Sequence, residues 1–137
     1  MRVVIDTNIL LVSVSDRSPY HSIFKSFIEG KYSLCVTTEI LDEYAEILHT
    51  YSSKFLANNT LEVIENAINT VFITRYFAFE LIKIDLDDNK FVDCAIASNA
   101  DFIVTNDGHF SVLKNIPFPK VKVISIDDFM EILLTKN

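Results

Sequence analysis

Four carboxylates spread along the chain are the residues whose chemistry is most informative. They are Asp6 in VVIDTNIL, Glu43 in EILDEYAEIL, Asp93 in KFVDCAIASNA and Asp107 in FIVTND. Acids that converge in a fold repel one another unless protons or cations neutralise them. Mg²⁺ and Mn²⁺ are hard ions that bind carboxylate oxygen and water, and such ions activate water and stabilise charge on a phosphodiester. A common location for these acids would therefore indicate a divalent-cation site with hydrolytic chemistry.

Asp93 is the most unusual of the four because apolar residues surround it along the chain. Phe91 and Val92 precede it, and the run from Cys94 to Ala97 follows it. An isolated carboxylate in such surroundings is costly in free energy or stays protonated. Asp93 therefore either points sideways into water or meets something positive, and we favour a bound cation.

Short apolar runs alternate with capped or amphipathic segments, which predicts alternating strands and helices. We expect strands at 2–5, 33–36, 102–105 and 121–126, with a further short strand possible at 80–84. We expect helices starting near residue 7 and at 18–30, 37–51, 58–77, 87–100, 107–113 and 127–136. This alternation favours one α/β domain, residues 1–137, with a parallel sheet covered by helices on both faces.

The predicted topology sorts the acids by position. The carboxyl ends of parallel strands lie along one edge of the sheet, where open α/β folds bind ligands. Asp6 follows the first strand and Asp107 follows the strand 102–105, so both belong at this edge, whereas Asp101 belongs at the opposite one. Glu43 lies on the flank of its helix's apolar arc, roughly 40° from Ile47. We expect the first turns of the next helix to bring Asp93 to the same edge.

Each acid also has an ordinary structural explanation. Asp6 and Asp107 could cap the segments that follow them, and Glu43 could be a partly exposed surface acid. We expect the other acids of the Glu43 helix to be solvated, namely Glu39, Asp42 and Glu46.

Composition limits the class of protein. The formal net charge of −7 argues against a broad basic surface for nucleic acid and fits better with acids that hold cations.

Cys35 and Cys94 lie in apolar runs, which predicts buried thiols, and His21, His49 and His109 are scattered without zinc-like spacing. We expect the start, MRVVIDTN, to form a strand and helix and not a signal peptide, and we expect a cytoplasmic protein without a membrane span.

The ordered set of VVIDTNIL, the acid in EILDEYAEIL and the late segment DDNKFVDCAIASNADFIVTND resembles the PIN domain family. The late segment is most similar to VapC-type toxins of bacterial toxin–antitoxin pairs. This resemblance implies a Rossmann-like parallel sheet of four or five strands and a metal-dependent ribonuclease. One departure is TND, where these toxins often have a central Gly.

The resemblance also implies roles for individual residues. Asp6, Glu43, Asp93 and Asp107 match the acidic quartet of the family, with Asp6 and Asp93 as principal ligands of Mg²⁺ or Mn²⁺. Thr7, Asn8 and Thr105 match nearby polar positions that orient a ligand or water. Asp88 and Asn89 belong to the family-like segment, but capping of the Asp93 helix explains them equally well. Lys90 could contact a phosphate, although we favour a solvated side chain.

The implied activity is hydrolysis of an RNA phosphodiester by metal-activated water, leaving 3′-hydroxyl and 5′-phosphate ends. A protein antitoxin would hold such a toxin inactive, and a homodimer is possible. An apolar cluster could serve either contact or pack within the domain, and its members are Phe72, Ile73, Tyr76, Phe77 and Phe79.

Two other functions remain open on the sequence. One is a non-catalytic PIN-like module that binds RNA or protein. The other is a receiver-like phosphoacceptor domain, which also gathers acids at a strand edge. The latter needs a lysine after a late strand, and FIVTND has none, so we rank it last.

Overall fold

A computed structural model describes residues 1–74, 78–82 and 86–135 of the chain. Its centre is a five-stranded sheet in which every strand pairing is parallel. The strands are β1 (Arg2–Ile5), β2 (Ser33–Val36), β3 (Thr70–Phe72), β4 (Phe102–Val104) and β5 (Val123–Ile124). Their spatial order is β3-β2-β1-β4-β5, so the connection reverses direction between β1 and β4. The predicted α/β, Rossmann-like architecture with four or five parallel strands is confirmed.

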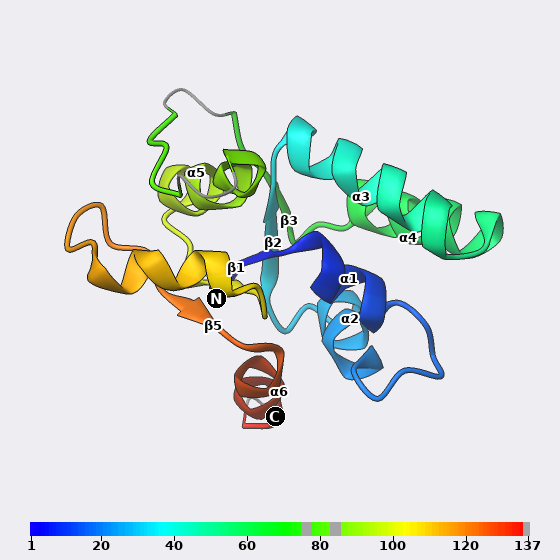
Figure 1. Cartoon of the computed structure of the whole chain (residues 1–137). Coiled ribbons are helices and arrows are strands. Elements are labelled where there is room, and N and C mark those ends of the chain that lie inside the picture. Colours follow the sequence, from blue (N-terminus) through cyan, green and yellow to red (C-terminus); the bar gives the residue numbers. More distant parts are fainter. Residues whose placement is uncertain (75–77, 83–85, 136–137) are drawn as a thin grey trace.

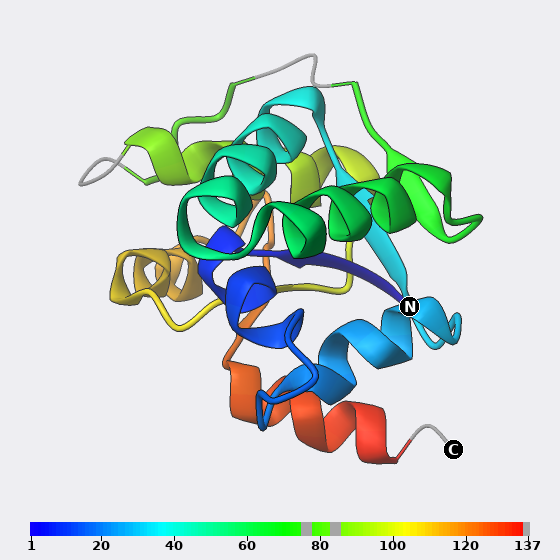
Figure 2. The same ribbon diagram turned by 90° about the vertical axis from the view of Figure 1, so that its right-hand side faces the viewer.

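Helices cover the sheet on two sides (Figure 1). On one side lie α1 (Thr7–Ser13), α2 (His21–Ile28), α3 (Thr38–Tyr51) and α4 (Lys54–Asn66). On the other side lie α5 (Asn89–Ser98), preceded by the 3₁₀ turn η1 (Leu86–Asp88), and the 3₁₀ segment η2 (Gly108–Asn115). Figure 2 shows α3 and α4 side by side, with α6 (Ile126–Leu134) next to α2 at the lower end.

The central strand explains why the sheet forms at these residues. Val3, Val4 and Ile5 are buried on both faces of the sheet, as expected for a strand of a parallel sheet that has helices on each side. Side-chain oxygens cap the helices that follow: Thr37 accepts a hydrogen bond from Ile40 N, and Ser53 accepts one from Leu56 N. These caps fix where α3 and α4 begin, because they satisfy backbone donors that the helices leave unpaired.

The third strand differs from the sequence prediction. We expected a helix through 58–77 and a possible strand at 80–84, but α4 ends at Asn66 and β3 begins at Thr70. Thr70 and Val71 are β-branched and favour an extended strand once Ala67 ends the helix. Residues 80–82 lie outside any strand, and 83–84 lie outside the described residues.

Several smaller predictions can also be compared with the structure. Cys35 and Cys94 are buried free thiols, and burial raises the pKa of Cys94 to about 12. In the predicted apolar cluster, Phe72 is exposed and Ile73 is half-buried, while Tyr76 and Phe77 lie outside the described residues. Among the residues that the structure describes, no helix is long and apolar enough to span a membrane.

Candidate metal centre

Asp6 lies at the topological switch point, directly after β1. Its backbone N donates to Val104 O at 3.1 Å, which continues the pairing of β1 with β4 beyond the strand. Its side chain is buried, and Thr105 Oγ1 donates a hydrogen bond to Asp6 Oδ2 at 2.7 Å. The same Thr105 oxygen accepts from Asp107 N at 3.0 Å. Thr105 therefore connects the two acids that follow neighbouring strands.

The pKa of Asp6 reflects its burial and the charges of two neighbouring acids. Burial raises the pKa of Asp6, and hydrogen bonds from the Thr105 side chain and the Thr7 backbone oppose that rise. The negative charges of Asp107 and Glu43 raise this pKa further. A nearby cation would reverse both unfavourable effects, because it stabilises the ionised carboxylate.

Glu43 reaches the same edge from α3. Its neighbour Tyr44 is fully buried and donates a hydrogen bond from its hydroxyl to Ile5 O, which holds α3 against the end of β1. Thr7 Oγ1 donates to Glu43 Oε2, and Lys90 Nζ lies 2.8 Å from Glu43 Oε1. Both carboxylate oxygens of Glu43 therefore have partners from this chain. The remaining acids of α3 are exposed, as expected: Glu39, Asp42 and Glu46.

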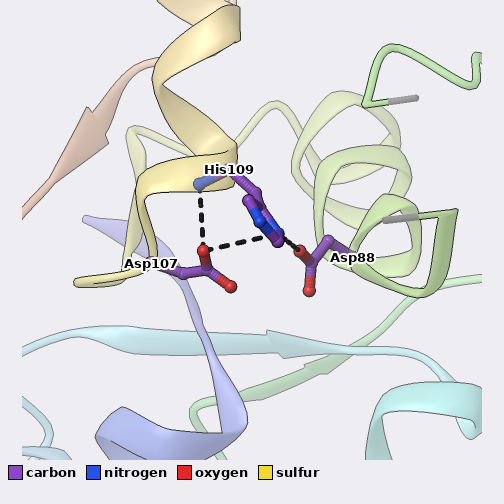
Figure 3. Close-up of side chains that lie close together, drawn as sticks. All are labelled: Asp88, Asp107 and His109. Carbon is purple, nitrogen blue, oxygen red and sulfur yellow. Dashed lines mark hydrogen bonds and ion pairs between the residues drawn. The ribbon is translucent and has the colours of Figure 1, made fainter. Parts of the chain in front are cut away.

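Asp107, Asp88 and His109 form the cluster that Figure 3 shows. His109 Nδ1 lies 3.5 Å from Asp88 Oδ2 and 3.6 Å from Asp107 Oδ1. One ligand atom from each residue lies within 4.8 Å of the other two. Asp107 also accepts a hydrogen bond from His109 N at 2.9 Å, so it caps η2 as well as facing the cluster.

Asp93 lies beside the residues that follow the carboxyl end of β3. It is almost fully buried, and its Oδ1 accepts a hydrogen bond from Phe79 N at 3.1 Å. It lines a cavity of about 440 Å³ together with Phe72 at the end of β3, the later residues Ile73, Thr74 and Phe79, and Ile96 and Ala97 of its own helix. Among the described residues, the charges of Glu43 and Asp107 act on Asp6, whereas the group of possible ligand atoms around Asp107 does not include Asp93.

Asp88 has the position that we expected for Asp93. Five residues separate the two, which corresponds to a rotation of about 140° around a helix, so they cannot face the same side. Asp88 is the N-cap residue of α5, yet within the described residues its side chain makes no capping hydrogen bond with that helix. The capping explanation therefore does not account for its carboxylate, which points toward His109 (Figure 3).

The helix pattern contained a signal for Asp88. Phe91, Val92 and Ala95 are three, four and seven residues after it, and this spacing places them on the same side of a helix as Asp88. All three are buried, and the centroids of the Phe91 ring and of the Phe110 ring of η2 are 6.4 Å apart. The side of α5 that packs toward η2 is therefore the one that carries Asp88.

Lys90 is buried, contrary to our expectation of a solvated side chain. Its side chain is 8% exposed, and Nζ lies 3.0 Å from Asp87 Oδ1 as well as 2.8 Å from Glu43 Oε1. Burial lowers the pKa of Lys90, but hydrogen bonds to Glu43 and Asp87 and the charges of both acids outweigh it, so the pKa is raised. Lys90 is therefore a charged group within the site.

A cavity of about 400 Å³ adjoins the acids. Asp6 and Asp107 form one side of it, Asn8 and Asn106 add amide groups, and the rest of the lining is Ile9, Val12, Tyr20 and Ile126. Asn106 Oδ1 accepts a hydrogen bond from Ile126 N at 3.1 Å, so the residue found in place of the frequent Gly links β4 to α6. A substrate in this cavity would lie directly beside the carboxylates.

The other two histidines have structural roles outside the acidic cluster. His21 Nδ1 lies 3.0 Å from Ser13 O, and His49 Nε2 lies 2.9 Å from Asn58 Oδ1. Sequence spacing gave no reason to single out His109, because its link to Asp88 depends on how η2 packs against α5.

The donor set fits a hard or borderline divalent cation. Asp88 and Asp107 offer carboxylate oxygens, which Mg²⁺ and Mn²⁺ prefer, and His109 offers a ring nitrogen that Mn²⁺ also accepts. Asp6 lies outside this group of three, but it is close enough to Asp107 for the charge of that acid to act on it. Lys90 provides the one buried ammonium among the described residues and meets Glu43 and Asp87. The cluster can therefore hold a cation close to the cavity.

Comparison with known proteins agrees with this architecture. The crystal structure of VapBC2 from Rickettsia felis bound to a DNA fragment from their promoter contains a similar chain, with a TM-score of 0.63 and 17% sequence identity. The match covers 91% of this chain and 98% of that one. FitAcB from Neisseria gonorrhoeae matches with a TM-score of 0.57 and 13% identity, covering 90% of this chain and 97% of that one.

Sequence comparisons give the family. None of the curated proteins matches the chain. The model of the PIN domain, however, matches residues 2–109, a span that begins with β1 and ends at His109. This span includes the strands and helices that position the acids, and it covers most of the chain. The protein therefore belongs to the PIN domain family.

Proposed function

We propose that this protein is a metal-dependent endoribonuclease and the toxin of a VapC-type toxin–antitoxin pair. The observation that carries the proposal is the meeting of Asp88, Asp107 and His109 at the carboxyl edge of the sheet, next to Asp6 and a cavity. A structural role alone gives no reason to gather several acids around a partly open site, because their repulsion destabilises the fold.

Each residue has a defined part in this proposal. Asp6, Asp88 and Asp107 would hold Mg²⁺ or Mn²⁺, with His109 as an additional donor. When bound, the ion would lower the pKa of water and stabilise charge on the phosphodiester. Thr105 fixes the Asp6 carboxylate through the 2.7 Å hydrogen bond, and Thr7 does the same for Glu43. We retain Glu43 as a positioning group and assign Asp93 to the β3 side of the fold.

The cavity beside the acids would accept the RNA strand. Asn8 and Asn106 offer amide groups for polar recognition, and Tyr20 offers a ring for stacking on a base. The shortage of basic residues, with 12 Lys and Arg against 19 Asp and Glu, is compatible with RNA binding only if the cation neutralises the site. An absolute requirement for a divalent cation follows from this charge balance.

We also propose a protein antitoxin as partner. The fold similarity to VapBC2, whose structure is a complex on promoter DNA, supports this partner. Phe72 is 58% exposed at the end of the edge strand β3 and could contact the antitoxin or a second copy of the chain. Such exposed aromatic residues are typical of protein interfaces.

The test is cleavage of labelled single-stranded RNA in Mg²⁺, Mn²⁺ or EDTA. Wild type should cut only with a divalent cation. Asp88→Asn should cut at least about 100-fold more slowly, because a loss of this size is typical when one group that stabilises the transition state is removed. Asp42→Asn on the exposed side of α3 is the matched control and should cut normally. Metal-independent cleavage, or equal rates in wild type and Asp88→Asn, would count against the proposal.

Asp93→Asn separates the two placements of the acids. Our assignment predicts that this variant keeps RNA cleavage as long as its melting temperature shows that it is folded. A folded Asp93→Asn without activity would restore the expectation from family resemblance. Binding of RNA without cleavage by every variant would favour the non-catalytic module.

A further inference from the structure

Lys90 uses all of its hydrogen-bonding capacity inside the site. Its Nζ lies 2.8 Å from Glu43 Oε1, 2.8 Å from Asp87 O and 3.0 Å from Asp87 Oδ1. An ammonium group has three donors, and three acceptors surround this one. The side chain is 8% exposed, so it cannot turn toward a substrate without losing these contacts. Contact of Lys90 with a phosphate is therefore disfavoured.

Glu43 has a partner on each carboxylate oxygen in the same arrangement. Thr7 donates to Oε2 and Lys90 lies at Oε1, so a cation that bound Glu43 would have to share an oxygen with one of them and lie close to the Lys90 ammonium. A metal ion beside Lys90 would also meet the repulsion of the ammonium, which its two contacts with Asp87 hold in place. The Lys90 ammonium therefore offsets the charge of Glu43, although it also pairs with the exposed Asp87, and this distinguishes Glu43 from the aspartates around it.

The Lys90 ammonium is itself a positive charge within the group of acids. It lies beside Glu43, whose charge also acts on Asp6, while Asp88 and Asp107 face His109. We propose that Lys90 takes the place of a second cation at Glu43 and limits the site to one divalent ion. This inference rests on the metal site of the proposed function. The ligands of that ion are then the aspartates and His109, and Glu43 acts only as a positioning residue.

Manganese titration by calorimetry, with electron paramagnetic resonance to count bound ions, tests this inference without relying on RNA cleavage. Wild type should bind one Mn²⁺ per chain. Lys90→Met frees Glu43 and removes a positive charge, so a second Mn²⁺ should bind and the first should bind on the order of tenfold more tightly. Lys25→Met removes an exposed lysine of α2 and is the matched control, which should behave as wild type.

The double variant Glu43→Gln with Lys90→Met gives a second, independent test. It removes both charges of a partly buried pair at once, a change that proteins often tolerate. If Glu43 is not a ligand, this variant should bind one Mn²⁺ with an affinity within about threefold of wild type, since a neutral pair is replaced by neutral residues. This result does not depend on whether Lys90→Met alone folds.

The outcomes separate this inference from the proposed function. Two Mn²⁺ ions in wild type, or no gain in Lys90→Met together with a large loss in the double variant, would show that Glu43 is a ligand and would overturn the inference while leaving the metal site intact. No Mn²⁺ binding in wild type would overturn the metal site and the inference with it.

Discussion

At the scale of single residues, Asp6 combines a cost to the fold with a benefit to binding. Its carboxylate is buried, and Asp107 and Glu43 repel it, so burial and like charges raise its pKa. We expect Asp6→Asn to stabilise the metal-free protein by roughly 1 kcal/mol, because the amide oxygen can still accept the hydrogen bond from Thr105 without a charge. The same variant should lose Mn²⁺ binding. Thermal unfolding in EDTA and calorimetry measure the two effects, and a lower melting temperature in EDTA would refute the first.

His109 should affect the choice of ion more than the ability to bind one. Imidazole suits Mn²⁺ better than Mg²⁺, which prefers oxygen donors. His109→Ala should therefore weaken Mn²⁺ binding by about tenfold and Mg²⁺ binding by much less. His49→Ala, at an exposed histidine of α3, is the control. Equal losses of affinity for Mn²⁺ and Mg²⁺ would indicate that His109 only supports the conformation of η2.

The residue scale also shows where prediction from sequence succeeds. Asp6 and Asp107 could be placed because Asp6 directly follows β1 and Asp107 follows β4 after two residues, and the position of a strand end depends little on side-chain detail. Asp88 and Asp93 could not be separated in this way, because the rotation of α5 decides which of them faces the site. Lys90 was mispredicted for a similar reason: its partner Glu43 is on α3, 47 positions away in the sequence, and only the packed structure brings them together.

At the scale of elements, the contact between α5 and η2 holds the cluster together. Phe91 and Phe110 are buried, their ring centroids are 6.4 Å apart, and they come from the two segments that carry Asp88 and His109. Phe110→Ala should lower the free energy of unfolding by about 3 kcal/mol, because it leaves a cavity in the core. It should also weaken Mn²⁺ binding, since Asp88 and His109 lose their common support.

Urea unfolding and calorimetry measure these two consequences of Phe110→Ala. Phe55→Ala is the matched control, because Phe55 is 80% exposed on α4 and its loss should change neither quantity. A destabilised Phe110→Ala that still binds Mn²⁺ as wild type does would show that the cluster is held by other contacts.

The elements themselves were predictable to different degrees. Apart from Arg2 and Ser33 at their starts, β1, β2 and β4 are apolar and buried, and their sequences are distinctive. β3 has three residues, of which only Thr70 is buried, so its pattern is too short to be separated from the end of the preceding helix. Its strand conformation depends on pairing with β2, which is a tertiary effect.

At the scale of the whole molecule, the charge balance determines how RNA can bind. The net charge is −7, and the cavity that adjoins the acids includes two aspartates but no lysine or arginine among its lining residues in the described chain. Affinity from broad phosphate neutralisation would fall steeply with salt, because each contact releases counterions. A bound divalent cation would instead offset the aspartates locally and contact the phosphate directly.

RNA binding should therefore depend strongly on the cation and weakly on monovalent salt. With Ca²⁺ in place of Mg²⁺ to slow cleavage, we expect EDTA to reduce affinity for single-stranded RNA at least tenfold, since the aspartates then repel the phosphate. Raising KCl from about 50 to about 200 mM should reduce it less than tenfold, whereas a protein with six or more phosphate contacts loses roughly a thousandfold or more. Fluorescence anisotropy measures both. A steep salt dependence that persists in EDTA would point to a basic RNA-binding surface away from the acids, and would separate binding from the metal centre.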